Sequence, residues 1–294
     1  MLKHLLDKSS KPKRVVVLGA AGFVGSACCR RLETLGVKAL PLSRTELDLN
    51  HPQAGDLLAN LLKPDDSLLF VAAKAPVKTE SMLIENVKIA SVVCQALNKS
   101  KVQHLVYISS DAVYADSSAP LNEESCSQPS SLHGIMHLTR EVMLSNASQG
   151  PLCFIRPTLI YGQDDPHNGY GPNLFMRQAK KGENILLFGE GEERRDHVWI
   201  EDVAELICRV LCRQSTGTLN IATGTVVSFR DIAEQVGDLS SSALKVKGSQ
   251  RSGPMPHNGY RAFDPSLSLK SFPDFIYTTL AEGLEKTYCS LTNL

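Results

Sequence analysis

The sequence predicts an α/β protein built on a doubly wound parallel sheet of the Rossmann type, with a smaller C-terminal substrate-binding lobe. Strand-like and helix-like segments alternate through the first two thirds of the chain, the pattern of a parallel sheet covered by helices. The first strand, Val15–Leu18, breaks at Gly19, and glycines return at Gly22 and Gly25 as a helix begins. At 294 residues the chain is long enough for one large domain with a small appendage.

Each predicted element has a local signal. The β-branched run of the first strand indicates a strand buried on both faces. Gly36 ends the first helix, and Pro41 places the second strand near an edge of the sheet, because proline cannot donate a ladder hydrogen bond. An apolar stripe marks the long helix 80–100. By these signals we expect strands at 15–18, 37–42, 67–73, 102–109, 152–156 and 218–222, and helices at 26–35, 57–62, 80–100, 133–147 and 200–211.

Two segments, 161–197 and 240–265, lose this regular pattern and are predicted to be irregular. In open α/β sheets, ligands bind beyond the carboxyl ends of the strands, where such segments collect. We therefore assign residues 1–160 to a dinucleotide-binding domain, which segments around 198–223 complete. Residues 161–197 and 224–294 are expected to form the substrate-binding lobe.

The composition excludes several classes of function. Lysine plus arginine and aspartate plus glutamate both number 31, so no net charge attracts nucleic acid or an anionic membrane. Residues 1–13 are too short and too charged for a signal peptide, and no apolar run reaches membrane-spanning length. The eight cysteines form no Cys-x-x-Cys pair, which argues against a zinc ribbon or a redox motif. A cytoplasmic protein without a bound metal is expected.

The glycine-rich turn has the chemistry of a phosphate-binding site. Gly19 permits the tight turn, Gly22 lets the backbone approach a pyrophosphate, and Gly25 lets the helix pack close to the strand. The helix N-terminus, where Phe23 and Val24 lie, offers free N–H groups and the positive end of the helix dipole. A purely structural turn is the alternative, but the strand before it and the helix after it favour nucleotide binding.

The end of the second strand bears on the choice of cofactor. An acidic residue usually meets the adenosine ribose here when NAD is preferred, but Ser43 and Arg44 come first and the first carboxylate is Glu46. Arg44 could pair with a 2′-phosphate, which slightly favours NADP over NAD, or it could be a solvated surface residue. Asp48 and Leu49 follow at a spacing suited to the adenine edge, although Asp48 could instead cap a turn.

Several motifs in the right order resemble the NAD-dependent epimerase/dehydratase family of extended short-chain dehydrogenases/reductases. The resemblance runs from about Lys13 almost to the C-terminus. It implies that the cofactor also contacts the end of the third strand and the helix that follows. The matching segments are Gly19–Gly25, Ala72–Ala73 followed by Lys74, Asn86–Val87, Ser109–Tyr114, Arg156–Pro157, Tyr161–Gly162, Arg195–Val198 and Asp202–Ala204.

The resemblance also implies a reaction and shows a departure from it. In this family a nicotinamide takes a hydride from a sugar carbon, a tyrosinate takes the hydroxyl proton, and a lysine one turn later holds the nicotinamide ribose. Ser110 matches the Ser/Thr that hydrogen-bonds the same sugar oxygen. Where the family has the tyrosine and the lysine, this chain has His133 and His137, with Gly134 and Glu141 fixing the register.

Three interpretations of this histidine pair remain open. With an ordinary pKa of about 6.5, His133 could exchange the hydroxyl proton without first becoming an anion, and His137 could still hydrogen-bond the ribose. Alternatively, the pair could ligate a metal, although no third ligand is evident. Finally, catalysis could be weakened or lost, which would leave a cofactor- and sugar-binding protein.

The resemblance places further residues at the substrate. Asp111 lies where sugar dehydratases have an acid, but Ala112 replaces their glutamate base, so Asp111 is expected only to hydrogen-bond the loop or a sugar hydroxyl. Asn173, Arg195 and Arg251 match residues that contact the nucleotide diphosphate, and guanidinium groups suit phosphate oxygens.

Together these features predict a nucleotide-sugar epimerase that uses a retained NAD or NADP. The alternatives are an NADPH-dependent keto-sugar reductase and a non-catalytic binding protein of the same fold. The resemblance further implies a homodimer, formed through the helices predicted at 80–100 and 133–147.

Overall fold

The computed structural model describes residues 2–166, 168–240 and 243–292, and within them six parallel strands form the main sheet in the order β2-β1-β3-β4-β5-β9. The chain winds outward from β1 in one direction and then in the other, so the doubly wound Rossmann-type fold is confirmed. The strands are β1 (Arg14–Leu18), β2 (Ala39–Leu42), β3 (Asp66–Phe70), β4 (His104–Ile108), β5 (Leu152–Pro157) and β9 (Gly217–Ile221). As predicted, the strand that contains Pro41 lies at an edge.

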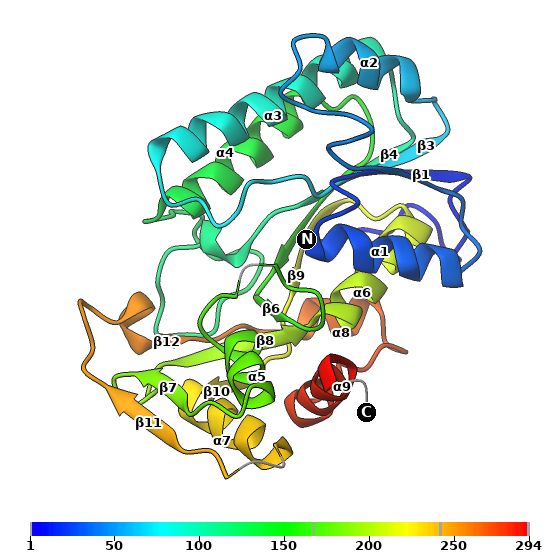
Figure 1. The fold of residues 1–294 in the computed structure, drawn as a ribbon. Helices are drawn as coiled ribbons and strands as arrows, with labels where there is room; N and C mark the ends of the chain where they lie inside the picture. Colours follow the sequence, from blue (N-terminus) through cyan, green and yellow to red (C-terminus); the bar gives the residue numbers. More distant parts are fainter. Residues whose placement is uncertain (1, 167, 241–242, 293–294) are drawn as a thin grey trace.

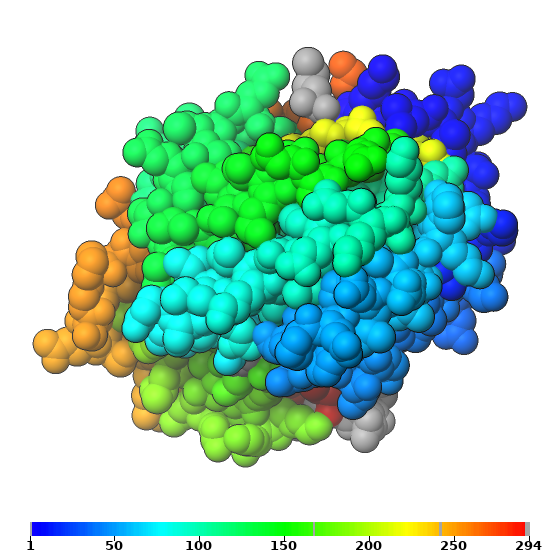
Figure 2. All heavy atoms as spheres, turned by 90° about the horizontal axis from the view of Figure 1, so that it is seen from above, coloured from blue at the N-terminus to red at the C-terminus, as the bar shows by residue number. Residues whose placement is uncertain are grey.

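Helices cover both faces of this sheet (Figure 1). Helices α1 (Phe23–Thr34) and α6 (Ile200–Arg213) pack on one face and bury one apolar core. Helices α2 (Ala54–Leu61), α3 (Glu80–Lys99) and α4 (Leu132–Ala147) cover the other face and bury a second core. Seen from above, α2, α3 and α4 lie side by side on the molecular surface (Figure 2). None of the helices in the described residues has the length and apolar character needed to cross a bilayer.

A smaller mixed lobe lies beyond the carboxyl ends of the main strands (Figure 1). Its central strand β8 pairs antiparallel with β10 and parallel with β12 and β6, and β7 pairs with β11 in a separate ribbon. Phe175 and Phe229 are buried in its core. The elements are β6 (Leu159–Tyr161), α5 (Pro172–Lys180), β7 (Ile185–Phe188), β8 (Arg194–Trp199), β10 (Val226–Ser228), α7 (Phe229–Leu239), β11 (Val246–Ser249), β12 (Tyr260–Arg261), α8 (Ser266–Ser271) and α9 (Leu280–Thr292).

The expectation that residues 161–197 are irregular is wrong. They contain helix α5, strand β7 and most of strand β8. Pro172 stands at the start of α5, where its missing N–H costs nothing. Strand β7 buries alternate residues, a period of two that its four consecutive apolar residues conceal in the sequence.

The third strand is shorter than its apolar run predicts. Strand β3 ends at Phe70, although the sequence stays apolar to Ala73. Beyond the strand, Val71 and Ala72 both donate backbone hydrogen bonds to the Leu18 carbonyl at 2.9 Å, and Val71, Ala72 and Ala73 line a cavity.

Candidate functional site

A cavity of about 940 Å³ opens between the carboxyl ends of the main strands and the smaller lobe. Leu18, Leu42 and Ile108 line it from the ends of β1, β2 and β4, and Tyr170 lines it from the lobe. Most of the residues singled out from the sequence line this cavity, namely Gly19, Gly22, Phe23, Val24, Ser43, Arg44, Asp48, Leu49, Ala72, Ala73, Lys74, Ser110, Asp111, His133, His137, Asn173 and Arg195. Gly25, Asn86 and Arg251 are not among its lining residues.

The glycine turn is shaped for close approach. Gly19 has φ +91°, and a Cβ there would lie 2.7 Å from the backbone of Ala72. A Cβ on Gly25 would lie 2.1 Å from the carbonyl oxygen of Gly19, so Gly25 is needed for packing and does not face the cavity. Helix α1 begins at Phe23 without a side-chain cap and without an acidic residue in its first turn. Its first N–H groups are therefore free of intrahelical and side-chain acceptors, as an anion-binding turn requires.

Both signs of charge occur at the β2 end of the cavity. The exposed Arg44 places its Nε 3.6 Å from a carboxylate oxygen of Asp48, and both residues line the cavity. Glu46 turns back on its own loop and accepts a hydrogen bond from the Ser43 backbone at 2.9 Å. Hydrogen bonds from Ser43 and Thr45 lower the pKa of Glu46 to about 2, so this carboxylate stays ionised beside the site.

Asn86 positions the segment after β3 from behind the cavity. Its buried side chain accepts a hydrogen bond from the Lys74 backbone N–H and donates one to the Lys74 carbonyl, both at 3.0 Å. The Lys74 ammonium pairs with Glu85 at 2.8 Å. The contact of Asn86 with a cofactor remains a prediction, and in this structure its side chain holds the backbone that faces the cavity.

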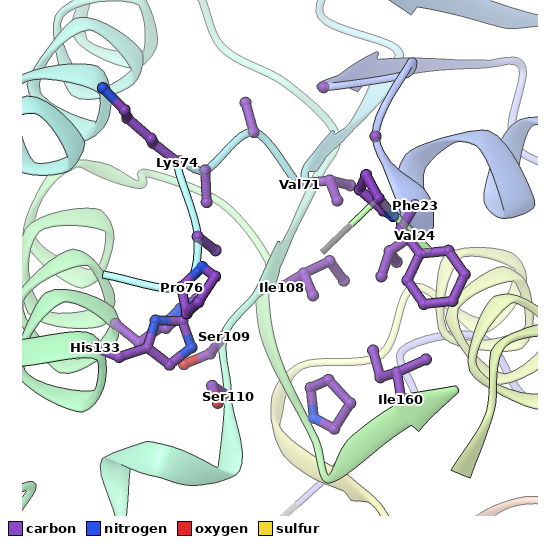
Figure 3. A pocket seen from close by; sticks show the side chains of 18 of the residues that line it. Phe23, Val24, Val71, Lys74, Pro76, Ile108, Ser109, Ser110, His133 and Ile160 are labelled. Atoms are coloured by element: carbon purple, nitrogen blue, oxygen red, sulfur yellow. The ribbon is translucent and has the colours of Figure 1, made fainter. Parts of the chain in front are cut away.

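The first turn of α4 lies against the short 3-10 helix that follows β4 (Asp111–Val113). A Cβ on Gly134 would lie 2.0 Å from the carbonyl oxygen of Ala112, so only glycine permits this approach. Ser131 caps the helix by accepting a hydrogen bond from the Gly134 N–H at 3.1 Å. This packing brings His133 next to Ser109 and Ser110, across the pocket from Phe23, Val24 and Ile160 (Figure 3).

The two histidines form a contacting pair in the cavity wall. Their ring centroids are 4.7 Å apart and the rings are nearly perpendicular. The Nδ1 of His133 accepts a long hydrogen bond from the Val77 N–H, at 3.4 Å. The Nδ1 of His137 lies 2.8 Å from the Tyr107 hydroxyl. Burial, followed by the charges of His133 and Arg140, holds the pKa of His137 well below its ordinary value, so His137 is neutral at neutral pH.

Ser110 is both a cap and a cavity-lining hydroxyl. Its Oγ accepts a hydrogen bond from the Ala112 N–H at 3.1 Å and donates one to Asp111 Oδ1 at 3.2 Å. The other carboxylate oxygen of Asp111 accepts from Nε of Arg261 at 3.2 Å. Arg261 is buried and comes from the smaller lobe, so the two parts of the molecule meet at this loop.

The predicted diphosphate-contacting residues have different surroundings. The amide of Asn173 is buried and is engaged by the Gly162 N–H at 3.0 Å and by Asp165 at 2.8 Å. Arg195 lines the cavity and directs Nε to Glu193 at 2.7 Å.

Arg251 instead lies against the turn after β7. Its guanidinium donates to the Phe188 carbonyl at 3.1 Å and approaches Glu192 at 3.5 Å. The structure therefore brings Arg195 to the cavity and leaves Arg251 off its wall, and diphosphate binding by Arg251 stays a prediction without structural support.

Sequence reasoning missed several polar residues of the site. His197 lines the cavity and is 5% exposed, and neither ring nitrogen has a hydrogen-bond partner of good geometry among the described residues. Burial lowers its pKa to about 3. Its place within the motif 195–198 could have identified it as a candidate site residue. Tyr107 and Arg140 gave no signal, because a tyrosine in an apolar strand and an arginine in a helix look like ordinary core and surface residues.

Within the described ranges, no group of three or more His, Cys, Asp or Glu side chains is arranged to hold a metal ion. The histidine pair at 133 and 137 therefore stands without further protein ligands of these types in that part of the chain.

The parallel six-stranded sheet with helices on both faces defines a Rossmann-type α/β fold. Residues 15–222 match the model of the NAD dependent epimerase/dehydratase family, and because this is more than half of the chain, the protein belongs to that family. The chain is 22% identical to the uncharacterized UDP-glucose epimerase YtcB of Bacillus subtilis (strain 168), over 96% of this chain and 98% of that protein.

Several solved structures of similar fold contain a bound cofactor. The complex of Thermus thermophilus UDP-glucose 4-epimerase with NAD has a TM-score of 0.82 at 22% identity, covering 94% of this chain and 97% of that one. A GDP-L-fucose synthetase from Naegleria fowleri bound to NADP also has a TM-score of 0.82, at 16% identity, covering 97% and 95%. At these identities the likeness establishes the fold.

Proposed function

We propose that the protein is a nucleotide-sugar epimerase that acts by transient hydride transfer to a retained nicotinamide cofactor. The observation that carries the proposal is that one cavity joins the glycine turn, the pair of Ser110 and His133, and the guanidinium of Arg195. A dinucleotide and an activated sugar need these three parts in one continuous space. Family membership and the UDP-sugar epimerases among the similar proteins support the same substrate class.

The cavity fits a dinucleotide on structural grounds. A Cβ at Gly19 would collide with the Ala72 backbone, and the uncapped start of α1 presents N–H groups where a pyrophosphate would lie. Gly22, Phe23 and Val24 would hold that pyrophosphate, while Ser43 and Arg44 would meet the adenosine end. When bound, the nicotinamide supplies a hydride acceptor and donor for the sugar carbon.

The chain's own residues would manage the proton of the sugar hydroxyl. His133 takes this proton as the sugar carbon is oxidised and returns it as the ketone is reduced, because an imidazole nitrogen can both accept and donate a proton. If Nδ1 takes the proton, the long contact from the Val77 N–H is given up. Ser110 exchanges its 3.2 Å bond with Asp111 for one to the sugar oxygen. His137 hydrogen-bonds a ribose hydroxyl and orients the nicotinamide.

The substrate end of the cavity is suited to anions. Arg195 offers donors to the diphosphate. The ring nitrogens of His197, which lack a well-placed partner among the described residues, can exchange a hydrogen bond with the nucleotide or the sugar. Asp111 is held by Arg261 and faces the cavity as a hydrogen-bond acceptor.

A second candidate is an NADPH-dependent keto-sugar reductase, which the position of Arg44 favours. Arg44 lines the β2 end of the cavity, where a 2′-phosphate would lie, and its ion pair with Asp48 is loose, at 3.6 Å. A guanidinium in this place suits a phosphate dianion better than a ribose hydroxyl.

One experiment separates these functions. The purified protein, with its co-purifying ligands identified by mass, is incubated with a panel of UDP- and GDP-sugars, and the products and the cofactor absorbance are followed together. An epimerase interconverts two sugars with no net cofactor change, whereas a reductase consumes NADPH one for one with a keto-sugar. Ser110→Ala and His133→Phe should each abolish turnover while cofactor stays bound. Cofactor and sugar binding without turnover by the unaltered protein would refute both enzymatic functions.

A further inference from the structure

A buried hydrogen bond lies behind the histidine pair. Tyr107, on β4, is fully buried among apolar side chains, and its hydroxyl lies 2.8 Å from the Nδ1 of His137. The guanidinium of Arg140 and the ring of Tyr107 both pack against Phe70, each about 5.2 Å from its ring centroid. The positive charge of Arg140 therefore lies in the same buried region as the bond between Tyr107 and His137.

Arg140 is an unusual residue because it is a fully buried cation. Its Nε and Nη2 donate to the Asn86 carbonyl at 2.9 and 2.8 Å, Nη1 donates to the Ala72 carbonyl at 2.9 Å, and Nη2 also donates to Asn86 Oδ1 at 2.8 Å. All of these acceptors are neutral oxygens, and none is a carboxylate. Its charge therefore acts on its neighbours Tyr107 and His137.

The surroundings of Tyr107 fix the direction of its hydroxyl proton. A guanidinium has donors only, so Arg140 cannot accept that proton. If His137 donated from Nδ1 to the Tyr107 oxygen, the buried hydroxyl proton would have no acceptor, at the cost of an unsatisfied buried donor. The satisfied arrangement has Tyr107 donating to Nδ1. The neutral imidazole then carries its own proton on Nε2.

We infer that Tyr107 is a positioning residue, which together with the buried guanidinium of Arg140 holds His137 in the neutral tautomer that offers Nε2–H to the cavity as a hydrogen-bond donor. The role of that donor toward the nicotinamide ribose rests on the proposed function; the tautomer itself does not. Where the family has a cationic lysine, this arrangement therefore provides a neutral side chain whose hydrogen-bond donor has a fixed direction.

Two further observations agree with this assignment. His137 faces a second imidazole at 4.7 Å and a buried guanidinium, and both neighbours oppose a positive charge on its ring. Burial acts in the same direction and more strongly. A neutral ring with one nitrogen already accepting can present only a donor from the other nitrogen.

The test is the tautomeric state of His137, read by two-bond ¹H–¹⁵N correlation spectra of the full-length protein labelled with ¹⁵N-histidine. The His137 signals are those missing from His137→Gln. We expect an unprotonated Nδ1 and a protonated Nε2 in the unaltered protein, and a shift of both nitrogens toward a tautomer mixture in Tyr107→Phe. A protonated Nδ1 in the unaltered protein would overturn the inference.

Tyr114→Phe is the matched control. It also removes a buried hydroxyl, which donates to Asn220 at 2.7 Å away from the histidine pair, so the His137 signals should stay unchanged. If Tyr114→Phe alters them as much as Tyr107→Phe does, the effect is a general loss of packing and the inference fails.

A binding measurement connects the inference to the proposed function. Tyr107→Phe should weaken NAD or NADP binding by roughly three- to tenfold, the value of one oriented hydrogen bond, while Tyr114→Phe leaves it unchanged. If the protein lacks epimerase activity but His137 has the stated tautomer, the proposed function falls and the inference stands. If the protein is active and Nδ1 is protonated, the inference falls alone.

Discussion

The contact between Gly134 and Ala112 allows a sharp test of how the site is assembled. In Gly134→Ala, the new Cβ would lie 2.0 Å from the Ala112 carbonyl oxygen and 2.7 Å from Cβ of Pro129. Ordinary van der Waals contact requires about 3.5 Å, so the first turn of α4 must move by more than about 1 Å from the loop that carries Ser110. His133 lies in that turn and moves with it.

The magnitudes follow from this displacement. Overpacking of this kind costs about 1 to 3 kcal/mol of unfolding free energy, less about 1 kcal/mol that alanine gains over glycine within a helix. Misplacing a catalytic group by about 1 Å lowers the rate roughly a hundredfold. We therefore expect a stability loss of at most about 2 kcal/mol together with a loss of about two orders of magnitude in kcat/KM.

Urea unfolding and steady-state kinetics measure the two effects. Gly237→Ala is the matched control, because it is also a helical glycine but nothing lies within 4 Å of its added Cβ. It should be neutral or slightly stabilising and fully active. A Gly134→Ala variant that is as stable and as active as the unaltered protein would show that the approach of α4 to Ala112 does not set the position of His133.

Three further outcomes are expected. If the predicted homodimer forms through α4, Val142→Glu should lower the mass measured by light scattering to that of a monomer, because Val142 is 56% exposed and lies two turns from the exposed Ile135 on this helix; a dimer mass that the substitution leaves unchanged would exclude this face. In calorimetry, Arg44→Ala should weaken NADP binding about tenfold and leave NAD binding unchanged. Equal effects on both cofactors would show that Arg44 is a solvated surface residue that does not recognise the 2′-phosphate. Burial lowers the pKa of His104 to about 4, whereas in the unfolded chain histidine has a pKa of about 6.5. As the pH is lowered through this range, only the unfolded chain gains the proton, so the free energy of unfolding should decrease. His104→Gln should make the pH dependence of urea-unfolding stability less steep over that range, while the buried His137 and His197 keep their share of it; an unchanged slope would exclude a contribution from His104.

The main sheet could be predicted from the sequence because its signals are local. The glycines at 19, 22 and 25 and the β-branched run before them determine the first turn and the start of α1 with few outside contacts. In the smaller lobe, strands β6 and β12 are three and two residues long and are stabilised by pairing with β8. Such short segments carry no periodicity of their own, so the sequence pattern could not reveal them.

The candidate site likewise contains residues that the sequence reveals and residues that it does not. Residues that line the cavity at motif positions, such as Ser110 and Arg195, could be found from the order of motifs along the chain. The surroundings of His137 could not, because Tyr107 is 30 residues away and the sequence does not show that Arg140 points inward. Arg251 is the opposite case, because its place in the sequence matches the family but its side chain does not line the cavity. It follows β11, which pairs with β7, and contacts the turn after β7.

The contact between Arg261 and Asp111 bears on how the protein forms during synthesis. The backbone that carries Asp111 leaves the ribosome about 150 residues before Arg261, which holds that carboxylate and the Asp111 carbonyl. The main sheet also lacks its last strand until residues 217–221 are made. The residues of the glycine turn are made early, but the loop bearing Ser110 gains its final partner only when residue 261 has been translated. Chains truncated before residue 261 therefore lack the contact that fixes the loop beside the histidines.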